Sequence, residues 1–261
     1  MVLLLRLPTV CFPPRPSSLL SSTRMALNSL NSEMNRSRTS VPDFSSKTTP
    51  LSNRKLPILL FDIMDTIVRD PFYHDVPAFF RMSMKELLEC KHPTAWLEFE
   101  KGTIDEEELA RKFFKDERPL DLEGLKDCMK SGYFYLEGVE ELLNALKTNN
   151  YEMHAFTNYP NWCEMIEDKL KISRYMSWTF CSFKNGKRKP DPEFYLEAIK
   201  HLEVDPGNCV FVDDRIKNVE AAIAVGIVGL HFKNAETLCQ DLSLMGIDVS
   251  DTDKDDQTGD Q

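Results

Sequence analysis

Ile58-Leu59-Leu60-Phe61-Asp62-Ile63-Met64-Asp65-Thr66 opens with an uninterrupted apolar run and then changes to a segment with two carboxylates and a hydroxyl. A short, continuous apolar run is typical of a strand that is buried on both faces of a parallel sheet. Asp62 would then lie at the carboxyl end of this strand. Open α/β sheets bind their ligands at that edge.

The sequence beyond this segment alternates between strand-like and helix-like patterns. Short apolar runs recur at 152–156, 177–181, 209–212 and 228–232. Apolar residues repeat at intervals of three and four at 136–146, 161–170, 192–202, 216–225 and 235–245. Strands that alternate with helices predict a parallel, Rossmann-like sheet covered on both faces by crossover helices, which is a doubly wound α/β fold.

Residues 70–135 interrupt this alternation, because they show helix-like patterns and no strand-like run. Helices are predicted at 83–91, 92–99, 105–114 and 121–130. We therefore expect a helical cap, residues 70–135, inserted after the first strand of a core that comprises 56–69 and 136–249. The acidic residues 250–261 lack apolar periodicity and are expected to form a disordered tail.

Three more polar motifs follow predicted strands, as Asp62 does. Thr157-Asn158 offers a hydroxyl and a backbone N–H as neutral donors to an anion, although Asn158 would also serve as a helix cap. Lys189 supplies a cation on a backbone that Pro190 and Pro192 stiffen. Asp213-Asp214 places two carboxylates side by side, which is costly unless a positive charge holds them. Mg²⁺ prefers oxygen ligands and is the expected ion, whereas a pair of helix-capping acids is the alternative.

In their order and their strand-end placement, these motifs resemble those of the haloacid dehalogenase-like hydrolases. The resemblance implies that Asp62 is the nucleophile of a phosphatase and forms an aspartyl-phosphate. It implies that Lys189 balances negative charge and that Thr157, Asn158 and Lys189 bind the substrate phosphate. The implied magnesium ligands are Asp62, the backbone carbonyl of Met64, Asp213 and Asp214.

The segment departs from the family pattern Asp-x-Asp-x-Thr at the second acid, which acts as general acid and base. Met64 occupies that position, and Asp65 stands one residue later, where the family usually has Gly. Asp65 could move the proton from its shifted position, or water could protonate the leaving group, and the sequence leaves both open. Because general acid catalysis is worth about 10²–10⁴ in rate, the lack of an acid at Met64 predicts a slow phosphatase.

Two other functions are alternatives to a phosphatase. Dehalogenases of the family also lack the second acid, but they work without metal and do not need Asp213-Asp214, which therefore favours phosphoryl transfer. The alternative that is not an enzyme is a catalytically impaired binding protein with the haloacid dehalogenase-like fold. Turnover of an activated phosphate ester with Mg²⁺ would separate this alternative from an enzyme.

The expected cap is rich in aromatic side chains, most of which should pack its own core, with two or three facing the cleft. They are Phe72, Tyr73, Phe79, Phe80, Trp96, Phe99, Phe113, Phe114 and Tyr133. Residues 61–72 and 157–160 resemble the plant chloroplast flavin mononucleotide (FMN) hydrolases within the family. This implies a small phosphorylated metabolite, FMN, as substrate, and riboflavin and phosphate as products. A sugar phosphate, phosphoglycolate or pyridoxal phosphate would suit the same motifs.

Residues 1–55 differ in composition from the rest of the chain. They are rich in Ser, Thr, Pro and Arg and contain only Glu33 and Asp43 as acids, which is typical of a transit peptide. We expect import into the chloroplast stroma rather than the mitochondrion, with an extension that has no targeting role as the alternative. Arg6 and Pro8 interrupt the apolar start, so neither a secretory signal nor a membrane span is expected.

Net charge bears on the partners. Without residues 1–55, 24 basic and 40 acidic residues remain, a net charge near −16. Such a charge repels polyphosphate backbones and argues against nucleic acid as a partner. A small phosphorylated substrate is still compatible, because a bound metal ion can reverse the local field. The sequence makes no prediction of the oligomeric state.

Overall fold

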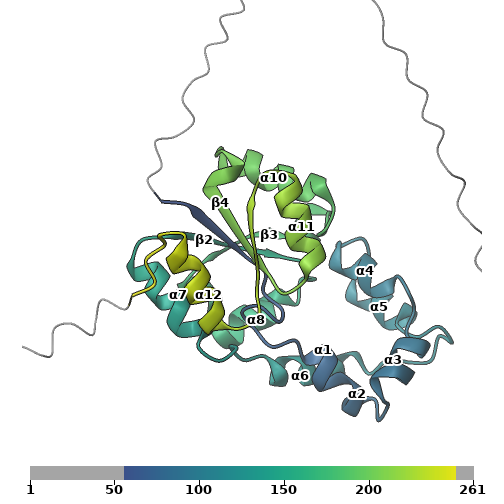
Figure 1. Ribbon diagram of the computed structural model, residues 1–261. Helices are drawn as coiled ribbons and strands as arrows, with labels where there is room; N and C mark the ends of the chain where they lie inside the picture. The colour runs from purple at the N-terminus through teal and green to yellow at the C-terminus, as the bar shows by residue number, and fades with distance from the viewer. Residues whose placement is uncertain (1–55, 251–261) are drawn as a thin grey trace, which may run out of the picture. The chain divides into compact units, whose positions relative to one another are not determined.

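The computed structural model describes residues 56–250, which are centred on a five-stranded parallel sheet in the order β3-β2-β1-β4-β5 (Figure 1). The strands are β1 (Ile58–Phe61), β2 (Glu152–Thr157), β3 (Ser177–Cys181), β4 (Cys209–Asp213) and β5 (Val228–His231). Because β1 pairs with both β2 and β4, the strand order reverses at β1. The carboxyl end of β1 therefore lies at the switch point where such sheets bind ligands.

The side chains of β1 pack alternately against two layers of helices. Ile58 and Leu60 join the apolar cluster of α10 and α11, whereas Leu59 and Phe61 join that of α7, α8 and α12. Figure 1 shows α10 and α11 on one side of the sheet and α7 and α12 on the other. These helices are α7 (Val139–Thr148), α8 (Cys163–Leu170), α10 (Pro192–Leu202), α11 (Ile216–Ala224) and α12 (Ala235–Leu244). With helices on both faces, β1 needs an apolar residue at every position.

Six short helices lie between β1 and α7. They are α1 (Pro71–His74), α2 (Val76–Phe79), α3 (Met84–Cys90), α4 (Ala95–Glu100), α5 (Glu106–Lys112) and α6 (Leu122–Gly132). Side chains cap most of these helices: Ser83 forms a capping box with Glu86, and Asp105 and Asp121 accept backbone N–H groups of α5 and α6. Capping of this kind compensates for the weak intrinsic stability of such short helices.

The structure confirms the predicted alternation of strands and helices in the core and the four longer helices that were predicted between 83 and 130. It adds α1, α2 and a further short helix, α9 (Ser182–Asn185). Each of these has four residues, too few for an apolar repeat to appear in the sequence. Residues 1–55 and the expected tail beyond Ser250 lie outside the described residues.

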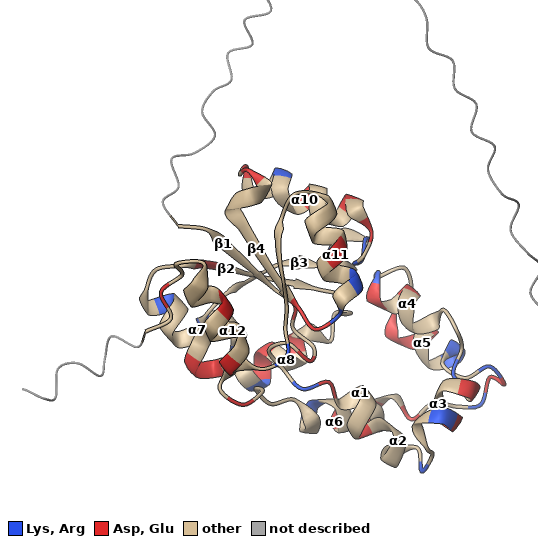
Figure 2. Cartoon of the chain, in the orientation of Figure 1, with Lys and Arg blue, Asp and Glu red and all other residues tan. Residues whose placement is uncertain are grey.

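Charged residues are distributed over both the core and the six-helix segment (Figure 2). None of the helices between residues 56 and 250 has the length and apolar character needed to cross a bilayer.

Candidate active site

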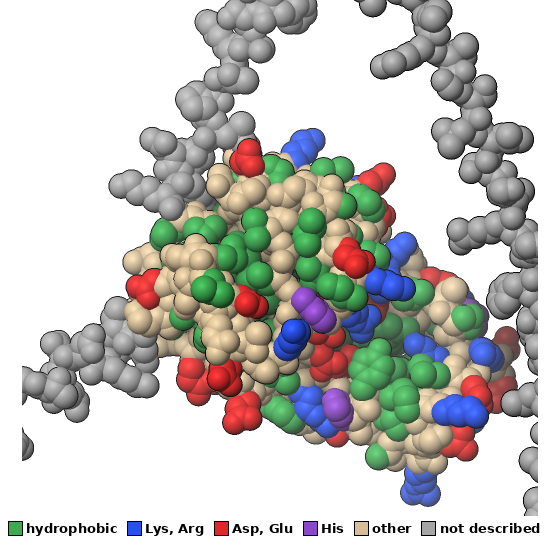
Figure 3. Space-filling view, in the orientation of Figure 1, with side chains coloured by type: hydrophobic (Ala, Val, Ile, Leu, Met, Phe, Trp, Pro, Cys, Tyr) green, Lys and Arg blue, Asp and Glu red, His purple; other side chains and the backbone are tan. Residues whose placement is uncertain are grey.

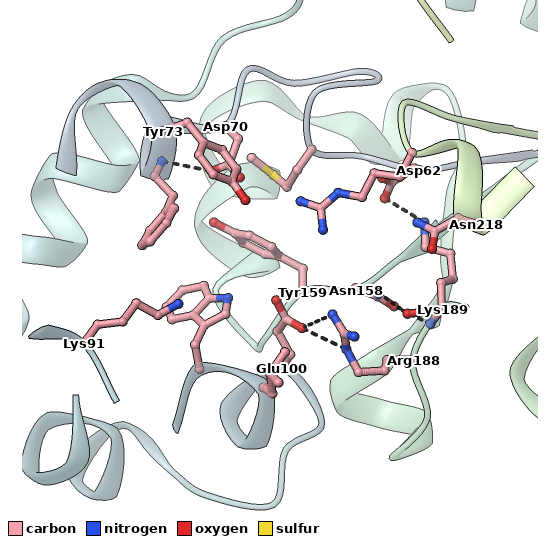
Figure 4. A pocket seen from close by; sticks show the side chains of 15 residues that line it. Asp62, Asp70, Tyr73, Lys91, Glu100, Asn158, Tyr159, Arg188, Lys189 and Asn218 are labelled. Carbon is pink, nitrogen blue, oxygen red and sulfur yellow. Dashed lines mark hydrogen bonds and ion pairs between the residues drawn. The ribbon is translucent and has the colours of Figure 1, made fainter. Parts of the chain in front are cut away.

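Polar side chains converge at the carboxyl edge of the sheet. Asp62 follows β1, Thr157 ends β2 and Asp213 ends β4. Asp62 borders a cavity between this edge and the helices α1 and α4, which Figure 4 shows from close by. The cavity is lined by Asp62, Met64, Asp70, Phe72, Tyr73, Lys91, Trp96, Leu97, Glu100, Asn158, Tyr159, Arg188, Lys189, Arg215 and Asn218.

Lys189 connects two of the carboxylates. Its side chain is 1% exposed, and its Nζ lies 2.9 Å from Asp62 Oδ1 and 2.6 Å from Asp213 Oδ2. Burial lowers the pKa of Lys189, but Asp213 and Asp62 outweigh this effect and raise it, so the side chain is a cation. Burial raises the pKa of Asp62 to about 7, although Lys189 acts in the opposite direction. A buried carboxylate here thus depends on neighbouring positive charge.

Asp62 has one engaged and one available carboxylate oxygen. Oδ1 accepts the backbone N–H of Ile63 at 2.8 Å in addition to its contact with Lys189. Among the described residues, no hydrogen bond or ion pair engages Oδ2. Oδ2 is therefore the oxygen that can reach a ligand in the cavity.

The adjacent acids Asp213 and Asp214 differ in their surroundings. Asp213 is fully buried and accepts hydrogen bonds from Lys189, the Arg215 N–H and the Asn218 side chain at 2.6–3.0 Å. Asp214 Oδ1 is buried and has no hydrogen-bond partner within residues 56–250. Burial raises the pKa of Asp214 to about 6, and the charge of Asp213 adds to this increase.

The arrangement of these acids fits a magnesium ion. Oxygen atoms of Asp62, Asp213 and Asp214 lie within 4.8 Å of one another. The donors are all oxygens, and the orphaned Oδ1 of Asp214 lacks a positive or donating partner, which a hard cation would supply.

The displaced carboxylate Asp65 has a backbone role. Its φ of 55° lies in the left-handed region, where Gly is favoured and Asp is tolerated better than most residues. Its Oδ1 accepts the backbone N–H of Asp70 at 2.9 Å, which ties the loop to the start of α1. Met64 lines the cavity and Asp65 does not. Thr66 returns to the site, since its Oγ1 accepts the backbone N–H of Asp214 at 3.1 Å.

The two residues after β2 contribute in different ways. Thr157 is fully buried, and its Oγ1 has no hydrogen-bond partner in the described part of the chain, so this hydroxyl is free to donate to a ligand. Asn158 uses its side chain to hold Lys189: Oδ1 accepts the Lys189 N–H and Nδ2 donates to the Lys189 carbonyl, both at 2.8 Å. The Asn158 side chain therefore positions the Lys189 backbone, while its own backbone remains the candidate phosphate donor.

Comparison with known proteins identifies the family. The family model described as haloacid dehalogenase-like hydrolase matches residues 57–226, which include every candidate site residue described above. The chain belongs to the haloacid dehalogenase-like (HAD) hydrolases. It is 68% identical over 197 residues to flavin mononucleotide hydrolase 1, a chloroplastic protein of Arabidopsis thaliana, with 76% of this chain and 80% of that protein aligned. A sesquiterpene phosphatase of Aspergillus oryzae is 27% identical over 170 residues, covering 62% of this chain and 84% of the relative.

Solved structures share the fold of this HAD hydrolase. A HAD family enzyme of Bacteroides thetaiotaomicron, in complex with magnesium and inorganic phosphate, aligns with a TM-score of 0.57 at 18% identity, covering 69% of this chain and 95% of that one. A HAD-like hydrolase of Porphyromonas gingivalis aligns with a TM-score of 0.58 at 18% identity, covering 73% and 97% of the two chains.

The cavity of this HAD hydrolase also contains charged residues that the motifs did not indicate. Asp70 is 8% exposed, and burial raises its pKa to about 6. Glu100, at the end of α4, pairs with Arg188 at 3.0 Å, and Arg215 forms no ion pair among the described residues. The space-filling view shows acidic and basic side chains side by side where the core meets the six-helix segment (Figure 3). In the sequence, Asp70 is indicated only by its position before Pro71. Arg188 and Arg215 are indicated only by their proximity to the motifs at Lys189 and Asp213-Asp214.

Proposed function

We propose that this HAD hydrolase is a magnesium-dependent phosphomonoesterase that converts FMN to riboflavin and phosphate in the chloroplast. The phosphatase reaction is supported by the cluster of Asp62, Asp213, Asp214 and Lys189, in which one carboxylate oxygen of Asp62 is available. FMN as the substrate is supported by the 68% identity to a plant FMN hydrolase over four-fifths of that relative. The name of that relative also supports a plastid location.

In this proposal Asp62 Oδ2 attacks phosphorus, the bond from phosphorus to the ribityl oxygen breaks, and an aspartyl-phosphate forms. Water then attacks phosphorus, releases phosphate and restores the carboxylate. Lys189 compensates the negative charge of Asp62 and the phosphoryl group, and the free hydroxyl of Thr157 donates to a phosphoryl oxygen. Mg²⁺, held by Asp62, the Met64 carbonyl, Asp213 and Asp214, would neutralise further negative charge at this centre.

The ribityl oxygen needs a proton as it leaves, and Met64 cannot provide one. Asp65 and water are the two candidates. The Asp65 carboxylate is engaged by the Asp70 N–H and does not line the cavity, which favours water as the donor. A phosphatase without a positioned acid is expected to be slow, and its rate should depend on how readily the substrate's leaving group departs.

The test is turnover by the purified full-length chain with Mg²⁺. FMN should be hydrolysed with a higher kcat/KM than phosphoglycolate, pyridoxal phosphate or hexose phosphates. Asp62→Asn should reduce turnover by roughly 10³-fold or more, because the nucleophile is lost. Asp168→Asn, an exposed change on α8, is the matched control. If the correctly folded wild-type chain hydrolyses none of these esters, the proposal that it is a phosphatase is wrong. If it prefers another ester, only the proposal that FMN is the substrate is wrong.

The role of Asp65 is tested by Asp65→Asn across a range of pH. If water is the proton donor, this variant should keep the shape of the wild-type pH profile. Loss of the limb of the profile that requires a protonated acid would instead assign the proton to Asp65.

A further inference from the structure

The wall of the cavity formed by α1, α3 and α4 carries aromatic rings and one cation. Phe72 on α1, Trp96 on α4 and Lys91 at the end of α3 all line the cavity. Figure 4 shows Lys91 entering from the side opposite Lys189. A ligand whose phosphate lies at Asp62 would therefore extend its other end towards these three side chains.

The aromatic part of this wall is fixed before any ligand binds. The rings of Phe72 and Trp96 are stacked, with centroids 6.3 Å apart and an interplanar angle of 29°. Trp96 also makes edge-to-face contacts with Phe99, Tyr159 and Trp162, at 5.6–6.4 Å between ring centroids. A rigid aromatic surface favours a planar ligand, because few side-chain rotamers are lost on binding.

Lys91 is a cation without an anionic partner. Its Nζ lies 5.0 Å from the Phe72 ring centroid, but it forms no ion pair among residues 56–250. The carboxylate of Glu100, which also lines the cavity, is already paired with Arg188 at 3.0 Å. Burial lowers the pKa of Lys91, and the charge of Glu100, which is already paired with Arg188, offsets this effect only in part. The ammonium donors of Lys91 are thus available to an acceptor on a ligand.

We propose that Phe72, Trp96 and Lys91 form the subsite for the flavin ring. In this subsite, the isoalloxazine packs against the aromatic wall and the Lys91 ammonium donates a hydrogen bond to one of the ring carbonyl oxygens. The inference rests on FMN as the substrate and adds which residues select it. A ligand with only an aliphatic carboxylate, such as phosphoglycolate, could pair with Lys91 but would leave the aromatic rings unused.

Riboflavin provides the test, because it contains the ring but lacks the phosphate. Binding to the full-length chain is measured from the quenching of riboflavin fluorescence, which stacking on Trp96 should produce. Lys91→Met should weaken riboflavin binding about tenfold, the effect expected for one hydrogen bond to a charged donor. The ratio of kcat/KM for FMN to that for glycerol 3-phosphate should fall by about the same factor. Lys91→Arg should restore part of both.

Lys85→Met is the matched control, since Lys85 lies on the same helix, is 84% exposed and is outside the cavity. It should leave both measurements unchanged. If wild type hydrolyses FMN but Lys91→Met binds riboflavin as tightly as wild type, the subsite is wrong and the proposed function stands. If Lys91→Met lowers kcat/KM for glycerol 3-phosphate, which has neither a carboxylate nor a ring, as much as for FMN, Lys91 attracts the phosphate in general, and the ring subsite is again overturned.

Discussion

At the scale of single residues, the backbone at position 65 explains why a carboxylate can occupy this position without disrupting the loop that follows Asp62. The backbone there needs a positive φ, and Asp satisfies this need at a smaller cost than most side chains. The Asp65 side chain then secures the Asp70 N–H. The acidic group next to Met64 is therefore explained by loop geometry, and its presence is not by itself evidence for proton transfer.

Asp70 provides a prediction about pH. Its pKa is raised from the ordinary 3.8 to about 6, first by burial and then by Asp65 and Glu100, whereas the Phe72 N–H and Arg215 oppose the increase. As pH rises from 4 to 6, the unfolded chain loses this proton before the folded chain does, so stability falls across this window. The cost is at most roughly 3 kcal/mol above pH 6. Asp70→Asn should remove this cost, because Asn carries no charge and its side-chain oxygen still caps α1.

The measurement is the melting temperature of wild type and Asp70→Asn at pH 4.5 and pH 7.5. The variant should gain stability relative to wild type at the higher pH, and the gain should shrink at the lower pH. An equal difference at both values would contradict a raised pKa for Asp70.

Asp214 provides a prediction about the metal. Mg²⁺ at about 100 times its Kd should stabilise the folded chain by about 2.7 kcal/mol, which corresponds to a rise in Tm of about 5–10 °C for a domain of this size. Asp214→Asn should lose most of this rise, because the unpartnered Oδ1 is replaced or neutralised. EDTA should reverse the shift in wild type, and Asp168→Asn should respond as wild type does. A full magnesium shift in Asp214→Asn would remove Asp214 from the ligand set.

At the scale of elements, the contact of α4 with α9 fixes one wall of the cavity. Ser182 Oγ, on α9, donates to the Glu100 carbonyl at 2.5 Å. Gly102, just after α4, has a φ of +67°, and a Cβ there would lie 2.6 Å from the Phe183 carbonyl oxygen. The backbone approach at this point leaves no room for a side chain.

Gly102→Ala should therefore displace the end of α4 and with it Glu100 and Trp96. We expect a loss of roughly 1–3 kcal/mol in the free energy of unfolding, together with a higher KM for FMN. The control is Gly246→Ala, which has a φ of +76° and nothing within 4 Å of the added Cβ. It carries the backbone strain without the clash. Equal KM values for the two variants would show that the α4–α9 contact does not shape the substrate site.

At the scale of the whole molecule, residues 1–55 are proposed to direct the HAD hydrolase to the chloroplast. Their composition, with Glu33 and Asp43 as the only acids, supports this role. A fusion of residues 1–55 to a fluorescent protein should be imported by isolated chloroplasts and processed to a shorter form. Residues 56–261 fused in the same way are the control and should stay outside. Import of the 1–55 fusion by mitochondria instead would contradict a plastid address.

Much of the architecture was predictable because its signals are local. A strand covered on both faces needs an unbroken apolar run, as at Ile58–Phe61, and an amphipathic helix needs a repeat of three to four, as at Pro192–Leu202. The four-residue helices α1, α2 and α9 were missed because a single turn contains no repeat. Of the nine cap aromatics, three line the cavity, Phe72, Tyr73 and Trp96, in agreement with the expected two or three.

The family, the parallel sheet and the acids at its edge could be predicted from the sequence, because each apolar run and each polar motif is continuous in the chain. Tertiary structure alone decided how these groups are used. It turned the Asn158 side chain towards the backbone of Lys189, engaged Asp65 with Asp70, and left one oxygen of Asp214 without a partner. It also brought Lys91 and Trp96 to the same cavity as Asp62. These contacts depend on distances between segments that are far apart in sequence. Packing of the whole chain sets those distances, and no local sequence pattern predicts them.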